Sequence, residues 1–289
     1  MALAEEMNLN LTGLEGTGPQ GRITRKDVEN VIHQRLTAAQ GGAASSLPDI
    51  KYAPNKVLET KPVDGVRRII FDRMGTSDRL TARVTMVTEA DATELVNFRE
   101  KLKAAKEELW GFKPGYNYLI GMIVAQTLQS HRYMNARLSE DGSRIEILEN
   151  INLGFAVDAD RGLLVPVVKQ ADKLSLESFG SQFQQLVSAA KSGRISPEDL
   201  SGGTFTITNL GSYDVDAFTP IINLPELAIL GVGRIRNQVV PYQGDVAIRK
   251  IMTLSLVFDH RLVDGAPAAK FLKEVKDAIE NPILRFVKI

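Results

Sequence analysis

The stretch SLVFDHRLVDGAPAAKFL, residues 255–272, holds one of only three histidines in a chain of 289 residues. Alternate residues from Met252 to Phe258 are apolar, which predicts a strand leading into His260. Apolar residues at helical spacing follow, so the sequence predicts a strand, a turn and a helix. Continued alternation would place His260 on the apolar side of the strand, and a lone histidine there most often belongs to the core.

Composition excludes several classes of chemistry. The chain has no cysteine, so disulfides, thiolate nucleophiles and Cys-type zinc sites are ruled out. Lys+Arg and Asp+Glu are both 35, which gives no electrostatic reason to expect nucleic acid or a membrane as partner. The start lacks a signal peptide, and the apolar run at 118–128 is too short for a membrane span. We expect a cytoplasmic protein, or one of the mitochondrial matrix if it is eukaryotic.

The chain divides into three parts by composition. Residues 1–36 predict a small all-α domain of two helices around a glycine-rich loop, with Thr24 capping the second helix. Residues 37–57 are dominated by Ala, Gly, Ser and Pro and predict a flexible linker. Residues 58–289 mix strand and helix patterns and predict one large domain.

The pattern in the large domain is that of a mixed α/β layer fold. We expect a strand at 83–91, a hairpin at 137–148 turning at Asp141-Gly142, and a strand pair at 151–169. Helices are predicted at 175–193, with Gly193 as its stop, and at 266–279. Asp264, just before the last helix, suits an N-cap.

The sequence His-x-x-x-Asp-Gly after a strand resembles the active-site motif of the chloramphenicol acetyltransferase-like acyltransferases. Residues 58–289 are similar, in order, to the dihydrolipoamide acyltransferase component of 2-oxo acid dehydrogenase complexes. The segments that carry this resemblance are GVRRIIFDRM (65–74), LGFAVDADRGLLVPVV (153–168), SGGTFTITNLGSYDVDAFTPIINLPELAILGVG (201–233), FDHRLVDGAPAAKFL (258–272) and ENPILRFVKI (280–289). The resemblance implies the chloramphenicol acetyltransferase-like fold and acyl transfer between dihydrolipoamide and coenzyme A, with acetyl the favoured acyl group.

The same resemblance implies roles for three residues. His260 would be the base that takes a thiol proton, a task that suits imidazole. Thr208, in the pattern FTIT, would donate a hydrogen bond to the oxyanion of the tetrahedral intermediate. Asp264 would pair with an arginine and fix the loop that carries His260. The candidate arginines are Arg67, Arg68 and Arg73; His33 and His131 are not expected to be catalytic.

Residues 3–29, LAEEMNLNLTGLEGTGPQGRITRKDVE, are similar to the peripheral subunit-binding domain of these proteins. That resemblance implies docking of dihydrolipoamide dehydrogenase or of the decarboxylase component, with Arg22 and Arg25 meeting an acidic partner surface. No lipoyl domain is recognisable, and Lys61 is interpreted as a surface lysine. Coenzyme A is therefore expected as a substrate, the lipoyl group is expected on a separate domain or chain, and no metal is expected.

The resemblance also implies a homotrimer with the active site between subunits, assembling into a larger cage. Apolar side chains at the end of the chain would bury themselves between trimers: Ile283, Leu284, Phe286, Val287 and Ile289. Two alternatives remain open. One is a non-catalytic scaffold that only binds the dehydrogenase, and the other is a stand-alone acetyltransferase for a small hydroxyl compound.

Overall fold

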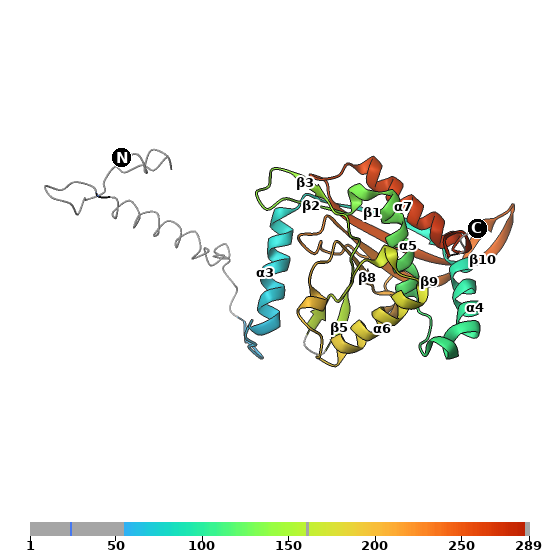
Figure 1. Cartoon of the computed structure of the whole chain (residues 1–289), viewed down its shortest axis with the longest axis horizontal. Helices are drawn as coiled ribbons and strands as arrows, with labels where there is room; N and C mark the ends of the chain where they lie inside the picture. The colour runs from blue at the N-terminus through green and yellow to red at the C-terminus, as the bar shows by residue number, and fades with distance from the viewer. Residues whose placement is uncertain (1–23, 25–54, 160–161, 287–289) are drawn as a thin grey trace. The chain divides into compact units, whose positions relative to one another are not determined.

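The structure is a computed structural model that describes Thr24 and residues 55–159 and 162–286. The predicted binding domain at 1–36, with Arg22, Arg25 and His33, lies outside the described residues apart from Thr24, and so does most of the linker. From Pro62 onward the chain forms one compact unit (Figure 1). No helix in the described part of the chain is long and apolar enough to cross a membrane.

A six-stranded mixed sheet forms the centre of this unit, in the order β1-β10-β9-β8-β4-β7. The first three strands are antiparallel neighbours, β8 runs parallel to both β9 and β4, and β7 closes the edge antiparallel. The strands are β1 (Arg83–Asp91), β4 (Leu153–Phe155), β7 (Val167–Val168), β8 (Phe205–Asn209), β9 (Ala228–Tyr242) and β10 (Asp245–Asp259). Two small hairpins add β2 (Ala136–Leu138) with β3 (Ile145–Ile147) and β5 (Val157–Ala159) with β6 (Gly162–Leu164).

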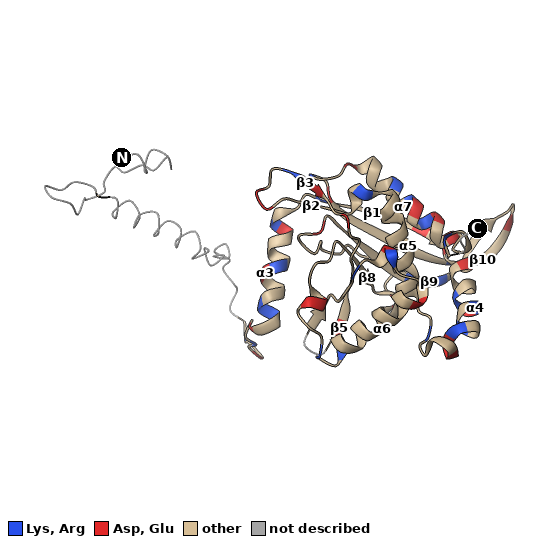
Figure 2. Ribbon diagram, viewed as in Figure 1, with Lys and Arg blue, Asp and Glu red and all other residues tan. Residues whose placement is uncertain are grey.

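Most helices pack on one face of this sheet and share its large apolar cluster, whereas the first, Gly65–Leu80, contacts the loop at Ile222 through Ser77. The helices are α3 (Gly65–Leu80), α4 (Thr93–Trp110), α5 (Tyr116–Ser130), α6 (Leu176–Lys191), α7 (Gly265–Glu280) and the short α8 (Ile283–Phe286). Helix α7 contacts β1, α4 and α5, and α5 in turn contacts α6. The central helix α5 has ten buried residues and no charged one. Figure 2 shows Lys, Arg, Asp and Glu along α4 and α7, whose outer faces are polar.

The two faces of the sheet have separate apolar cores. Phe205, Ile207 and Phe258 belong to the large cluster on the helical face, and the Phe205 ring contacts Phe271 of α7 at 5.6 Å between centroids. Ile229 and Val257 point to the opposite face, where they pack with Ile222 in a small second cluster. Since strand side chains alternate, neighbouring residues of these strands point to opposite faces, except where β9 bulges between Val232 and Ile235.

The predicted elements are confirmed in most cases. Strand β1 has the predicted bounds, β2 and β3 form the predicted hairpin, and α6 begins after Ser175, whose hydroxyl accepts a hydrogen bond from the Ser178 N–H. Gly193 follows α6 with a φ of 68°, as a helix stop requires. Helix α7 begins directly after Asp264, but the Asp264 side chain makes no capping hydrogen bond.

The end of the chain departs from the prediction. Phe286 stacks on Phe98 of α4 at 5.0 Å between ring centroids, and Arg285 pairs with Glu274 of α7. Phe286 is therefore used within its own domain and is not part of a free apolar patch. Ile283 and Leu284 remain 54% and 69% exposed. Val287 and Ile289 lie outside the described residues.

Candidate active site

His260 is exposed and lies one residue past the end of β10. The prediction that it continues the apolar side of the strand is wrong, because the strand ends at Asp259 and the chain turns there. The His260 ring lies 5.8 Å from that of Phe258, and its Nε2 lies close to Gly265, the first residue of α7. The imidazole therefore lies beside the first residue of α7, where it is accessible from solvent.

The buried residue Asp259 anchors the turn that carries His260. Asp259 is 2% exposed, and its Oδ1 accepts hydrogen bonds from the backbone N–H groups of Ala82 and Arg261, each at 3.1 Å. The Arg261 guanidinium donates to both carboxylate oxygens, the shortest contact being 2.6 Å. Burial alone would raise the pKa of Asp259, but these hydrogen bonds outweigh burial and hold that pKa below its usual value.

Asp264 has no ion pair among the described residues, so none of the three candidate arginines meets it in this chain. Arg68 lies over the Phe71 ring at 5.5 Å, and Arg73 lines a cavity together with Asn223 and Glu226. Asp264 is exposed at the start of α7. Its position four residues after His260 makes it part of the same turn, with its carboxylate facing solvent.

Thr208 is half-buried in β8, opposite Gly231 of β9. Its hydroxyl makes no hydrogen bond to another described residue, which leaves the donor available. Since Ile207 points into the helical core, Thr208 points to the other face of the sheet. A methyl group at Gly231 would meet the Phe218 ring at 3.2 Å, so glycine allows the segment around Phe218 to lie close beside Thr208.

Thr208 and His260 do not meet within one chain. Thr208 aligns with Gly231, which aligns with Ser255 of β10, five residues before His260. Strand geometry therefore separates them by about 17 Å along the strands and about 10 Å across them. A site that uses both residues needs a second copy of this chain.

A cavity of about 530 Å³ lies at the end of β8 on the helical face of the sheet, the face opposite to that of the Thr208 side chain, and Thr208 does not line it. Its lining includes Tyr116 and Asn117 of α5 and Asn209, whose side-chain amide donates to Asn117 Oδ1 at 2.6 Å. Gly211 and Gly233 have no side chains, so backbone atoms form this part of the cavity wall. The cavity is mainly apolar with a few polar groups, the composition expected of a small-molecule site.

Sequence reasoning missed Glu226, a carboxylic acid buried at the other end of β8. Glu226 is 3% exposed and lines a second cavity of about 470 Å³. Its Oε1 accepts a hydrogen bond from Asn223 at 2.9 Å, while its Oε2 has no hydrogen-bond partner. Burial raises the pKa of Glu226 to about 8, opposed in part by the side chains of Thr206 and Asn223. The acid is therefore mostly protonated at neutral pH.

Two other residues considered in the sequence have ordinary environments. His131 bridges Tyr133 and Glu274, with contacts of 2.7 Å from Nδ1 and Nε2 respectively, and packs edge-on against Phe271. Lys61 is exposed and, in the described part of the chain, pairs with Glu59 at 3.5 Å. The first is a packing residue and the second a surface lysine. His260 is the exposed histidine of the described residues.

Solved structures place this fold among acyltransferase catalytic domains. Dihydrolipoamide acetyltransferase from Azotobacter vinelandii superimposes with a TM-score of 0.78 at 33% identity, covering 83% of this chain and 99% of that one. The cubic core of a pyruvate dehydrogenase multienzyme complex gives the same TM-score at 32% identity, with the same coverage of each chain.

The family models identify both parts of the chain. The catalytic domain of the 2-oxoacid dehydrogenases acyltransferase family matches residues 55–287, and the E3-binding domain matches residues 2–29. The chain therefore belongs to the acyltransferases of 2-oxo acid dehydrogenase complexes.

Curated relatives agree with this assignment. The acetyltransferase component of the acetoin cleaving system of Bacillus subtilis is 37% identical over 97% of this chain and 67% of its own length. The acyltransferase component of the branched-chain α-keto acid dehydrogenase complex of Pseudomonas aeruginosa is 33% identical over 99% of this chain and 65% of its own length. The chain thus spans about two thirds of the length of these relatives.

Proposed function

We propose that the chain transfers an acetyl group between the thiols of dihydrolipoamide and coenzyme A, with His260 as base and Thr208 as oxyanion donor. A matching residue spacing carries this assignment. One serine, one histidine and one asparagine are the residues whose catalytic role was investigated in the Azotobacter vinelandii enzyme. The serine stands 52 positions before that histidine and the asparagine 4 positions after it. Thr208 and Asp264 stand at the same offsets from His260.

The reaction follows from these groups. The imidazole of His260 removes the proton from the attacking thiol, and the thiolate forms a bond to the thioester carbonyl carbon. The Thr208 hydroxyl of a second copy donates a hydrogen bond to the resulting oxyanion. Collapse of the intermediate breaks the bond to the other sulfur, which leaves as a thiol with the proton from His260. Thr208 replaces a serine with the same hydroxyl donor, and Asp264 replaces the asparagine.

Acetyl is the acyl group favoured by the relatives. The acetoin-system acetyltransferase is more similar to this chain, at 37% identity, than the branched-chain enzyme, at 33%. The difference is small, so a donor series is the appropriate test. The lipoyl group would come from a domain outside this chain or from another chain, and the reaction needs no metal.

Partners follow from the domain order. The match at residues 2–29 supports docking of dihydrolipoamide dehydrogenase, with Arg22 and Arg25 as contacts. The division of the chain into a binding domain at 1–36, a linker at 37–57 and a catalytic domain at 58–289 stays a prediction, as does a cytoplasmic location. The separation of Thr208 from His260 supports an oligomer, which we expect to be a trimer, and the likeness to a cubic core supports a larger cage.

The experiment is a thiol acetylation assay on the purified chain. Acetyl-CoA, propionyl-CoA and isobutyryl-CoA are offered as donors, and dihydrolipoamide or chloramphenicol as acceptor. We expect transfer from acetyl-CoA to dihydrolipoamide, none to chloramphenicol, and none with His260→Ala. Transfer to neither acceptor by a folded oligomer would instead identify a binding scaffold.

A further inference from the structure

The backbone around His260 forms a closed ring of hydrogen bonds in which Asp259 is the central member. The His260 N–H donates to the Ala82 carbonyl at 2.9 Å, and the Ala82 N–H donates back to Asp259 Oδ1 at 3.1 Å. Ala82, the residue before β1, therefore binds both the backbone of His260 and the side chain of Asp259. These hydrogen bonds use the backbone of His260 and not its imidazole. They therefore fix the position of the residue and leave both ring nitrogens free for the reaction.

Further contacts of Asp259 hold the turn on either side. Its N–H donates to the Leu227 carbonyl at 3.1 Å, and its own carbonyl accepts from Leu262 and Val263 at 3.0 and 3.3 Å. Arg261 neutralises the carboxylate with its guanidinium while its own backbone N–H also donates to it. Three separate segments of the chain thus converge on this one residue. Removing the charge would leave buried donors unsatisfied and loosen the segment that carries the imidazole.

We propose that Asp259 is a positioning residue for His260, acting through Ala82 and Arg261 to hold the imidazole where it meets the second subunit. This inference rests on the proposed role of His260 as base. Displacing a catalytic group by about 1 Å can lower the rate about 100-fold, because proton transfer requires close alignment. The effect belongs to the chemical step, so it lowers kcat and leaves KM for both thiols nearly unchanged.

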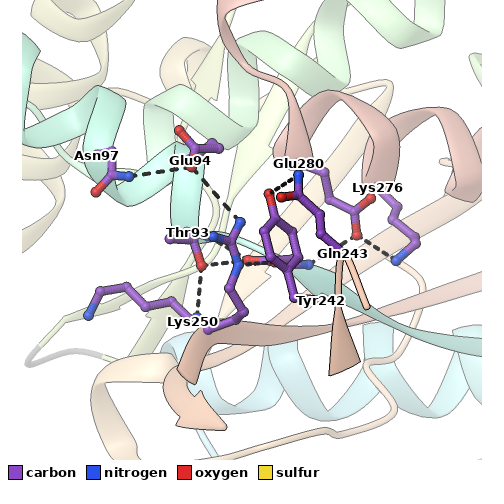
Figure 3. A network of polar contacts seen from close by, with 10 residues as sticks. Thr93, Glu94, Asn97, Tyr242, Gln243, Lys250, Lys276 and Glu280 are labelled. Atoms are coloured by element: carbon purple, nitrogen blue, oxygen red, sulfur yellow. Dashed lines mark hydrogen bonds and ion pairs between the residues drawn. The ribbon is translucent and has the colours of Figure 1, made fainter. Parts of the chain in front are cut away.

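The chain offers a matched control at the other end of the same strand pair. Asp91, the last residue of β1, is partly buried and, like Asp259, accepts from a backbone N–H, that of Thr93 at 3.0 Å, and from an arginine, Arg249 at 2.6 Å. Figure 3 shows this polar network around Thr93, Tyr242 and Lys250. It lies a whole strand length from His260, so Asp91→Asn removes the same kind of interaction without touching the turn.

The experiment compares Asp259→Asn, Arg261→Gln and Asp91→Asn with the wild-type chain, each checked for its oligomeric state. We expect Asp259→Asn to lower kcat about 10- to 100-fold with KM changed less than about twofold, and Arg261→Gln to lower kcat several-fold. Asp91→Asn should keep the wild-type kcat. If Asp259→Asn does not fold, Arg261→Gln decides, because Arg261 is half-exposed and its removal leaves the backbone ring in place. A wild-type kcat in the folded variants would overturn the proposal.

Hydrogen–deuterium exchange of the peptide containing His260 supplies a readout that does not depend on activity. Asp259→Asn should speed exchange of this peptide about 10-fold or more, whereas Asp91→Asn should leave it unchanged. If exchange of this peptide is faster in Asp259→Asn but the wild-type chain transfers no acetyl group, the proposed reaction is contradicted while the positioning of His260 by Asp259 is supported. Unchanged exchange together with unchanged kcat would overturn the positioning role alone.

Discussion

The imidazole at position 260 and the hydroxyl at position 208 receive different tasks because their surroundings differ. His260 is exposed beyond the last strand residue and is held through its backbone, so its side chain is free to accept a proton. Thr208 is half-buried on a strand, and its hydroxyl has no other partner among the described residues. In the proposed reaction a positioned base and a positioned donor act on the tetrahedral intermediate from two sides.

Replacing Thr208 by Ala should lower kcat about 100-fold or more, because one oxyanion donor is lost. KM for coenzyme A and dihydrolipoamide should change little, since the hydrogen bond strengthens only in the transition state. Thr208→Ser keeps the hydroxyl and is the control, with kcat close to wild type. Steady-state kinetics check this. A change confined to KM would move the oxyanion role to another residue.

Glu226 gives the protein a predictable pH dependence of stability. Its folded pKa of about 8 lies above the ordinary value of 4.5, so the folded state binds the proton more tightly than the unfolded state. The stabilisation is complete below pH 4.5 and is lost as pH rises toward 8, by at most about 1.4 kcal/mol per pH unit. Urea unfolding of wild type and Glu226→Gln at pH 5 to 8, at one protein concentration, measures the difference. Parallel curves for the two proteins would contradict this account.

At the scale of single elements, the close contact of α5 with the sheet depends on one glycine. A methyl group at Gly121 would come within 2.7 Å of Phe155 and 2.9 Å of Phe179. We expect Gly121→Ala to destabilise the domain by about 1–3 kcal/mol through overpacking. Gly75 of α3 is the control, since its added methyl meets nothing nearer than 3.5 Å and alanine favours a helix by about 1 kcal/mol. Thermal unfolding that ranks the two variants in the opposite order would refute this.

Local patterns predicted the elements well where they depended on neighbours in sequence. The alternation at 83–91 and the apolar face at 175–193 appear as β1 and α6 because period and capping are local properties. The exposure of His260 was not predictable from alternation, since β10 is buried on both faces from Ile251 to Asp259 and ends there. The charges flanking His260 were the available signal for Asp259 and Arg261. The ring through Ala82 is a contact over more than 170 residues, which no local pattern encodes.

The sequence could indicate the individual site residues but not their relative positions, because these depend on the register of the strands. The motif and the FTIT pattern indicated His260, Thr208 and Asp264 individually. Their separation depends on how β8, β9 and β10 align, and that alignment is set by nonlocal pairing. Glu226 gave no signal, because an acid before an apolar strand looks like an ordinary surface residue. The carboxyl of Glu226 is buried because it lies against Asn223 and the wall of the cavity, and these contacts are not visible in the sequence.

At the scale of the whole molecule, the exposed apolar residues of α8 predict a contact between trimers. Ile283 and Leu284 are exposed, while Phe286 and Arg285 stabilise their own domain. Replacing Leu284 by Glu should therefore reduce a cage to trimers without unfolding them, since a charge in an apolar contact is costly. Deleting residues 283–289 would also remove the Phe286 contact and is the less specific test. Light scattering should show active trimers; an unchanged particle mass would place the contact elsewhere.

The central claim is that one copy supplies His260 and another supplies Thr208. Co-expression of His260→Ala and Thr208→Ala chains with different tags, followed by purification on both tags, yields hybrid oligomers that measure this most directly. Every trimer that carries both tags has one intact site of three, so activity should rise to about a third of wild type, or about a quarter where whole cages of randomly mixed trimers are recovered, although each variant alone is nearly inactive. Hybrids no more active than the mean of the two parent variants would contradict a shared site.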